Sequence, residues 1–143
     1  MIRMLIGITV LRLLFFCGFS HADDQDNRQK ISMPVMMKER MLARMRDHLL
    51  ALQEIQAAMA GNNLDKASDI AETRLGVSSM PMPMRHEMAP YMPQSMRMIG
   101  MKMHKAASIF AMKASEGDEQ RALSSLSEVT QQCVACHAAY RLN

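Results

Sequence analysis

Apolar and polar positions alternate with a helical period over most of the chain. The first helix should begin at Ser32, a residue suited to capping, with Pro34 in its first turn. Apolar residues then recur at steps of three, four, three and seven, at Leu42, Met45, Leu49, Leu52 and Met59. Because this spacing keeps side chains on one helix face, we expect this stripe to face the core. Gly61 should end the helix.

Three more helices are predicted further along the chain. The second fits Leu64 to Leu75 and closes at Gly76, the third spans Ser95 to Ser115, and the fourth runs from Asp118 to Arg141. The third should bury Met96, Ile99, Met103, Ala106 and Phe110. The fourth should bury Leu123, Leu126, Val129, Cys133, Cys136 and Tyr140. Residues 77–94 carry four prolines and are predicted to be a long connection.

These elements predict an all-α fold, an antiparallel four-helix bundle over residues 23–143. Residues 23–31 are polar and should form a frayed start. No segment has the pattern of a strand, and no internal repeat is visible.

The first 22 residues have the layout of a secretory signal peptide. Arg3 precedes an apolar run from Leu5 to Phe19, and the small-residue exit ends at Ala22. We expect cleavage near Ala22, export to the periplasm of a Gram-negative bacterium, and no membrane insertion after cleavage. Cys17 falls within this leader.

Charge and composition exclude several classes of function. The formal net charge of +3 drops to about +1 once Arg3 and Arg12 leave with the signal peptide, so nothing favours a nucleic-acid partner. The chain has no Trp and no Gly-rich phosphate loop, which disfavours an α/β enzyme.

The chemistry lies near the C-terminus, in the sequence Cys133-Val134-Ala135-Cys136-His137. This C-x-x-C-H spacing is the attachment motif of c-type haem. Two thiols three residues apart on a helix can each reach one vinyl group of the porphyrin, and the histidine can then ligate the iron. A disulfide, a thioredoxin-like redox pair, or a zinc site completed by His104 are the alternatives.

Together with Tyr140 and Arg141, this motif on the last helix resembles the cytochrome c-prime family and its low-spin relatives. The resemblance implies a four-helix bundle with one covalent haem c at Cys133 and Cys136 and with His137 as the proximal iron ligand. It also implies that Arg141 lies near the haem; the alternative for Arg141 is a solvated cation at the helix end.

The residue opposite His137 determines the activity that the resemblance implies. Low-spin members carry a methionine there, about sixteen positions before the glycine that ends the first helix, and counting back from Gly61 gives Met45. A thioether ligand suits electron transfer. Met41 and His48 are the other candidates, and a core role for Met45 is the alternative. High-spin members instead leave the position open and bind NO or CO.

A second feature is the high methionine content. The chain has 18 methionines, and the proline-rich connection holds Met80, Met82, Met84, His86, Met88 and Met92. Thioethers with an imidazole suit Cu(I), so this segment is a candidate copper site. A flexible apolar lid over the haem, or compositional drift, would explain the same residues.

We therefore expect a periplasmic one-electron carrier and not an enzyme. We expect it to exchange electrons with redox partner proteins. The resemblance is also compatible with a homodimer, because family members often dimerise through their first two helices. A gas-binding cytochrome and a copper-binding Met-rich protein are the alternative functions.

Overall fold

A computed structural model describes residues 26–80 and 82–143. Within them the chain forms the five helices α2 (Val35–Ala60), α3 (Leu64–Ile70), α4 (Met82–Met88), α5 (Gln94–Ser115) and α6 (Glu119–Ala139). Short turns of π- and 3₁₀-helix, η1 (Ala71–Leu75), η2 (Val77–Ser79) and η3 (Ala89–Tyr91), join them. The all-α class is confirmed. The predicted signal peptide and its cleavage site lie outside the described residues.

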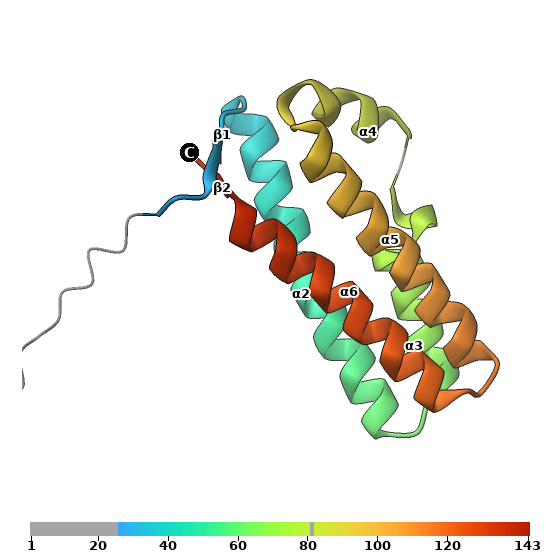
Figure 1. Cartoon of the computed structure of the whole chain (residues 1–143). Helices are drawn as coiled ribbons and strands as arrows, with labels where there is room; N and C mark the ends of the chain where they lie inside the picture. The colour runs from blue at the N-terminus through green and yellow to red at the C-terminus, as the bar shows by residue number, and fades with distance from the viewer. Residues whose placement is uncertain (1–25, 81) are drawn as a thin grey trace, which may run out of the picture.

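The long helices run up and down beside one another (Figure 1). α2 descends in the view, α3 returns, α5 descends, and α6 returns across the front of α2. α5 packs mainly along α6, and α3 lies against both α2 and α5. α4 lies at the upper end, beside the start of α5.

Small side chains fill much of the main core between these helices. Its largest fully buried side chains are Ile55, Leu75, Phe110 and Val129. Around them lie the buried alanines 51, 58, 67, 71, 106, 107, 111, 114 and 122. Because alanine has no side chain beyond Cβ, the helix backbones can pack closely here. The face predicted for the third helix is confirmed: Met96, Met103, Ala106 and Phe110 are buried, and Ile99 is partly so.

The face predicted for the first helix is partly wrong. Leu42 is exposed, and 69% of Leu49 is exposed, whereas α2 buries His48, Ala51, Ile55 and Ala58. The two faces differ by about one residue, or roughly 100° of rotation. Close packing against α3 requires small side chains. The face of α2 that contains alanines is therefore buried, and the bulkier leucine face is not. For the same reason α6 buries Ala122 and leaves Leu123 exposed.

Both ends of the described chain also differ from the prediction. Gln29–Ile31 forms strand β1, which pairs in parallel with strand β2 (Tyr140–Leu142), so the predicted frayed start and absence of strands are wrong. Ile31 is buried against Tyr140 and Met96 in a second core. This pairing joins the two ends of the chain, so neither short segment by itself carries a sequence pattern that would predict it. The last helix therefore ends at Ala139, two residues earlier than predicted.

The start of α2 and the connection differ as well. α2 begins at Val35 with Pro34 as its N-cap residue, three residues later than the Ser32 start predicted. The connection contains α4, with Pro83 in its first turn. A proline is tolerated there because the amide that it lacks has no partner within the helix. The predicted second helix continues past Ile70 as the π-turn η1 and ends at Gly76, whose amide donates to the Ala71 carbonyl at 2.7 Å.

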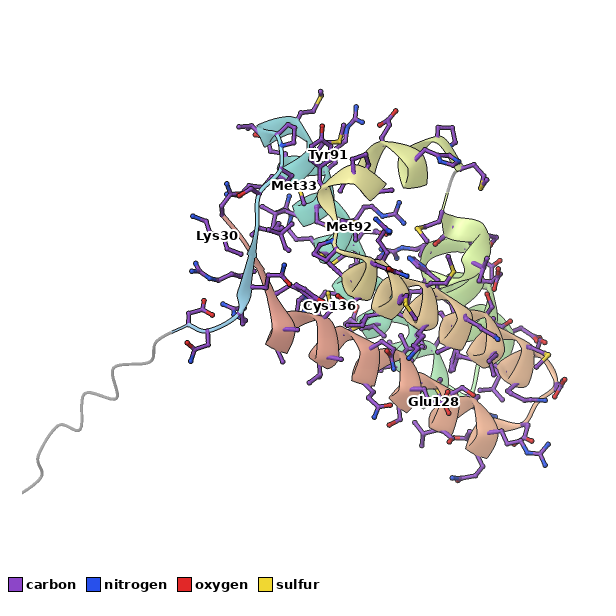
Figure 2. The ribbon with its side chains drawn as sticks, turned by 45° about the horizontal axis from the view of Figure 1, so that its top comes forward. Lys30, Met33, Tyr91, Met92, Glu128 and Cys136 are labelled. Atoms are coloured by element: carbon purple, nitrogen blue, oxygen red, sulfur yellow. The ribbon has the colours of Figure 1, made fainter. Side chains whose placement is uncertain are left out.

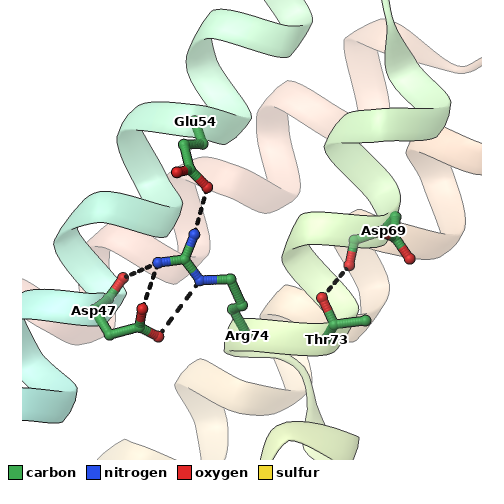
Figure 3. Close-up of polar contacts among 5 residues, drawn as sticks. All are labelled: Asp47, Glu54, Asp69, Thr73 and Arg74. Carbon is green, nitrogen blue, oxygen red and sulfur yellow. Dashed lines mark hydrogen bonds and ion pairs between the residues drawn. The ribbon is translucent and has the colours of Figure 1, made fainter.

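An arginine fixes η1 against α2 (Figure 3). Arg74 forms ion pairs with Asp47 and Glu54, and its Nη2 also donates to the Asp47 carbonyl oxygen at 3.2 Å. The hydrogen bond from Arg74 lowers the pKa of Asp47. These contacts hold the end of η1, including Leu75, at a constant position beside α2.

None of the helices in the described part combines the length and the apolar character that a membrane span requires.

Two leucines of α6 test this packing. Leu126 is 5% exposed and Leu123 is 52% exposed. Leu126→Ala should lower the free energy of unfolding by about 2–4 kcal/mol, because it leaves a cavity in the main core. Leu123→Ala is the matched control and should cost less than about 0.5 kcal/mol. Urea denaturation followed by circular dichroism measures both; equal losses would contradict the helix orientation.

Candidate functional site

A cavity of about 390 Å³ lies between the N-terminal halves of α2 and α5. We call it the α2–α5 cavity. α2 contributes Arg40, Met41, Arg44, Met45 and His48 to its wall. Steps of three and four residues place these side chains on one helix face, one above the other. The predicted iron ligand Met45 and both alternatives, Met41 and His48, are therefore together in this wall.

The methionine-rich connection covers the same cavity. Its contribution to the wall is Met80, Met82, His86, Met88, Ala89 and Met92. The side chain of Met84 lies outside the described part of the structure. The thioethers that the sequence singled out thus face the same space as Met45, although the connection and α2 are far apart in the chain.

α5 completes the wall with Arg97, Gly100, Met101 and His104. Gly100 lies within the helix, where glycine costs about 0.5–1 kcal/mol relative to alanine. A Cβ atom built on Gly100 would meet nothing within 4 Å. Packing within the protein therefore does not require a glycine at this position, which faces open space in the cavity.

Two histidines meet in the cavity wall. His48 is 8% exposed and His104 is 5% exposed, and their ring centroids are 5.8 Å apart with the rings nearly perpendicular. The Nδ1 atom of His104 lies 2.7 Å from the Leu75 carbonyl oxygen. Since a carbonyl only accepts hydrogen bonds, Nδ1 carries the proton, and the neutral ring has its lone pair on Nε2. Such a bond also fixes the ring orientation.

The environment keeps His48 uncharged at neutral pH. Burial lowers the pKa of His48 to about 4, and the nearby Arg44 guanidinium adds to the effect. A neutral imidazole is the form that binds metal ions.

The cysteines lie in the last turns of α6, on its inner side. Cys133 and Cys136 are half-buried and have free thiols. Cys133 packs against the main core, and Cys136 packs against the second core, as do Met41, Met88 and Met92. Figure 2 labels Cys136 on α6 and Met92 just before α5. Burial raises the pKa of both thiols. Cys136 and three methionines of the cavity wall thus pack against the same core, although Cys136 is not itself part of the wall.

The residues that follow the cysteines are at the surface or in β2. His137 is exposed, and its carbonyl oxygen accepts a hydrogen bond from Arg28 Nη1 at 3.3 Å. Arg141 is in β2, where its Nε lies 3.4 Å from an Asp26 carboxylate oxygen. The last helix was predicted to include Arg141, and that placement is wrong. Neither His137 nor Arg141 lines the cavity.

Tyr140 ties the end of α6 to the start of α5. Its ring is buried in the second core, and its hydroxyl group lies 2.5 Å from the hydroxyl group of Ser95. Because this contact joins the two helix ends, it holds the cysteine-bearing turns of α6 beside the α2–α5 cavity.

The sequence prediction missed the pairing of His48 with His104. It considered His104 only as a partner of the cysteines in a zinc site; within residues 26–80 and 82–143, no three His, Cys, Asp or Glu side chains group to hold a metal ion. One signal was available. The spacing Met-x-x-His occurs at 45–48 and again at 101–104, on two predicted helices. The prediction also missed three arginines in the wall, Arg40, Arg44 and Arg97.

Comparison with known protein families, with curated proteins and with solved structures finds no match to this chain.

The burial of His48 predicts a pH dependence of stability. Its pKa is about 4 in the folded protein and 6.5 in the unfolded chain. The unfolded chain therefore binds the proton more tightly, so stability is full above pH 6.5 and is lost as the pH falls towards 4, by up to about 3 kcal/mol. Chemical denaturation of metal-free protein at pH 7.5, 5.5 and 4.5 measures it.

His48→Gln should remove this part of the pH dependence. His86→Gln, which changes an exposed histidine of the same cavity, is the control and should retain it. Parallel curves for wild type and His48→Gln would contradict the burial of an uncharged His48.

Proposed function

We propose that this protein is an exported c-type cytochrome with one covalent haem, built as a four-helix bundle, and that it carries single electrons in the periplasm without transforming a substrate. In this proposal α2, α3 with η1, α5 and α6 are the four helices of the bundle. Cys133 and Cys136 hold the haem, His137 is the proximal iron ligand, and Met45 is the distal one. A bound haem supplies a ferric–ferrous couple for one-electron transfer.

The observation that carries the proposal is the place of the C-x-x-C-H motif. Both thiols are half-buried on the inner side of α6, and Cys136 packs against the second core, as do Met41, Met88 and Met92 of the cavity wall. A porphyrin joined to these sulfurs has an apolar, methionine-lined space next to its attachment point. That space also contains Met45.

The cavity itself fits a haem in two further respects. Gly100 leaves open the position that a Cβ would fill, as expected where a flat ring packs against a helix. Arg44 and Arg97 give the wall a positive charge, and Arg40, which forms an ion pair with Glu87 at 3.1 Å, adds a third guanidinium; such groups suit the two carboxylates of a haem. In this proposal the three arginines would hold and orient the propionate groups, while the methionines would exclude water from the ring.

The first test is maturation of the full precursor in a bacterium with a c-type cytochrome assembly system. We expect a coloured periplasmic protein whose mass exceeds that of the mature chain by one haem and resists denaturation, because thioether bonds are covalent. Each of Cys133→Ser and Cys136→Ser should lose one thioether bond, and the double variant should lose covalent haem entirely. Mass spectrometry and a haemochrome spectrum measure this.

Cys17→Ser is the matched control, since that cysteine lies in the predicted leader and should not affect haem attachment. A colourless product with two free thiols and the unmodified mass would refute the proposal.

The second test concerns Met45. Met45→Ala should convert a six-coordinate, low-spin optical spectrum into a high-spin one, lower the reduction potential, and allow carbon monoxide to bind the ferrous form quickly, because a thioether ligand is lost. Met98→Ala is the control, as Met98 is an exposed methionine of α5 outside the cavity wall.

An unchanged spectrum in Met45→Ala rules out this ligand. Conversion in Met41→Ala instead would assign the iron to Met41, one turn earlier. A high-spin spectrum with rapid carbon monoxide binding in the wild-type protein would favour the gas-binding alternative.

A further inference from the structure

The same short motif lies on two neighbouring helices. Met45 and His48 are three residues apart on α2, and Met101 and His104 are three residues apart on α5. Residues with this spacing share a helix face. All four line the α2–α5 cavity, and the two histidines are in ring contact. Metal sites in helical proteins are often built in this way, from i, i+3 pairs on facing helices.

We propose that His48, His104 and Met101 form a Cu(I) site at the end of the α2–α5 cavity where the two histidines meet. The site lies deeper along α2 and α5 than the methionines that pack, like Cys136, against the second core, and it differs from the Met80–Met88 segment that the sequence suggested.

The separation of the rings fits one shared ion. A metal–imidazole nitrogen bond is about 2.0 Å and the nitrogen lies about 1.2 Å from its ring centre, so two rings on one metal have centres at most about 6.4 Å apart. The observed centroid separation of 5.8 Å lies within this limit, with the two ring planes nearly perpendicular. Because Nδ1 of His104 is engaged with the Leu75 carbonyl oxygen, Nε2 would be the atom that binds the metal ion, as in many metal-bound histidines.

The charge of the cavity wall and the type of donor atom determine which metal ion the site prefers. Imidazole and thioether together suit copper, and thioether in particular suits Cu(I). Among the residues that the structure describes, none in the wall carries a carboxylate, the ligand type that magnesium, calcium and manganese need. Arg44 and two further arginines make the wall positive, which penalises a divalent ion more than a monovalent one.

The site does not require the haem of the proposed function. Met45 is left to the iron, so copper and haem can be bound together. Copper binding can also be measured on haem-free chain. The outcome for copper therefore does not depend on whether the chain is a cytochrome.

The test is titration of the purified protein, as matured, with Cu(I) under anaerobic conditions against a chromogenic chelator. We expect one Cu(I) per chain with submicromolar affinity. His48→Gln and His104→Gln should each weaken binding at least tenfold, and Met101→Leu, which preserves size and apolar character, should weaken it about three- to tenfold. The spin state of the haem should be unchanged in all three variants.

His86→Gln is the matched control, because this exposed histidine lines the same cavity from α4 and should leave the affinity within twofold. X-ray absorption of the copper-loaded wild type should show two imidazoles and one sulfur, a result that does not depend on any variant folding. No retained copper, a sulfur-only shell, or loss in His86→Gln but not in the His48 and His104 variants would overturn the proposal. A spin-state change in His48→Gln would do so too, because it would make His48 an iron ligand.

Discussion

Close packing of alanine-rich helix faces is the constraint on which the rest of this structure depends. Ala51 and Ala58 of α2 face a core that alanines of α3, α5 and α6 also fill, so the backbones approach one another. Nearer their N-termini the same helices carry methionines, arginines and histidines, which need more room. The α2–α5 cavity lies where the small side chains end. α3 and η1, which pack against both α2 and α5, thus hold these two helices in place while their N-terminal halves enclose a space.

Polar contacts then fix the chemistry of that space. Arg74 anchors η1 to α2 through Asp47 and Glu54, and the adjacent Leu75 carbonyl accepts the hydrogen bond that orients His104. His48 meets His104 across the cavity and is kept neutral by burial. Contacts outside the cavity therefore fix the orientation of the His104 ring that a metal ion would meet. At the C-terminal end of α6, the β1–β2 pairing and the Tyr140–Ser95 contact hold the cysteine-bearing turns in place.

The two proposals use one property of the wall, its soft donors. A thioether from Met45 would favour ferrous haem iron, and a thioether from Met101 with two imidazoles would favour Cu(I). Both ions are stabilised in their reduced forms by such ligands. A positive wall fits both as well, since it attracts haem carboxylates and tolerates a monovalent ion better than a divalent one. Under the two proposals, one cavity between α2 and α5 would hold a haem beside Cys136 and a copper ion beside the histidine pair.

Local pattern alone determined the helical class, the limits of α5 to within one residue, its buried face, and the motif at Cys133, Cys136 and His137, because each depends on spacing within a short segment. It also placed Met45 on the same side of α2 as the cavity. Tertiary structure decided the rest. The choice between the Leu49 face and the Ala51 face of α2 depended on how closely α3 approaches. The pairing of Ile31 with Leu142 and the meeting of His48 with His104 join residues far apart in the chain. A periodic pattern describes one helix at a time, whereas such contacts form only when separate elements pack together.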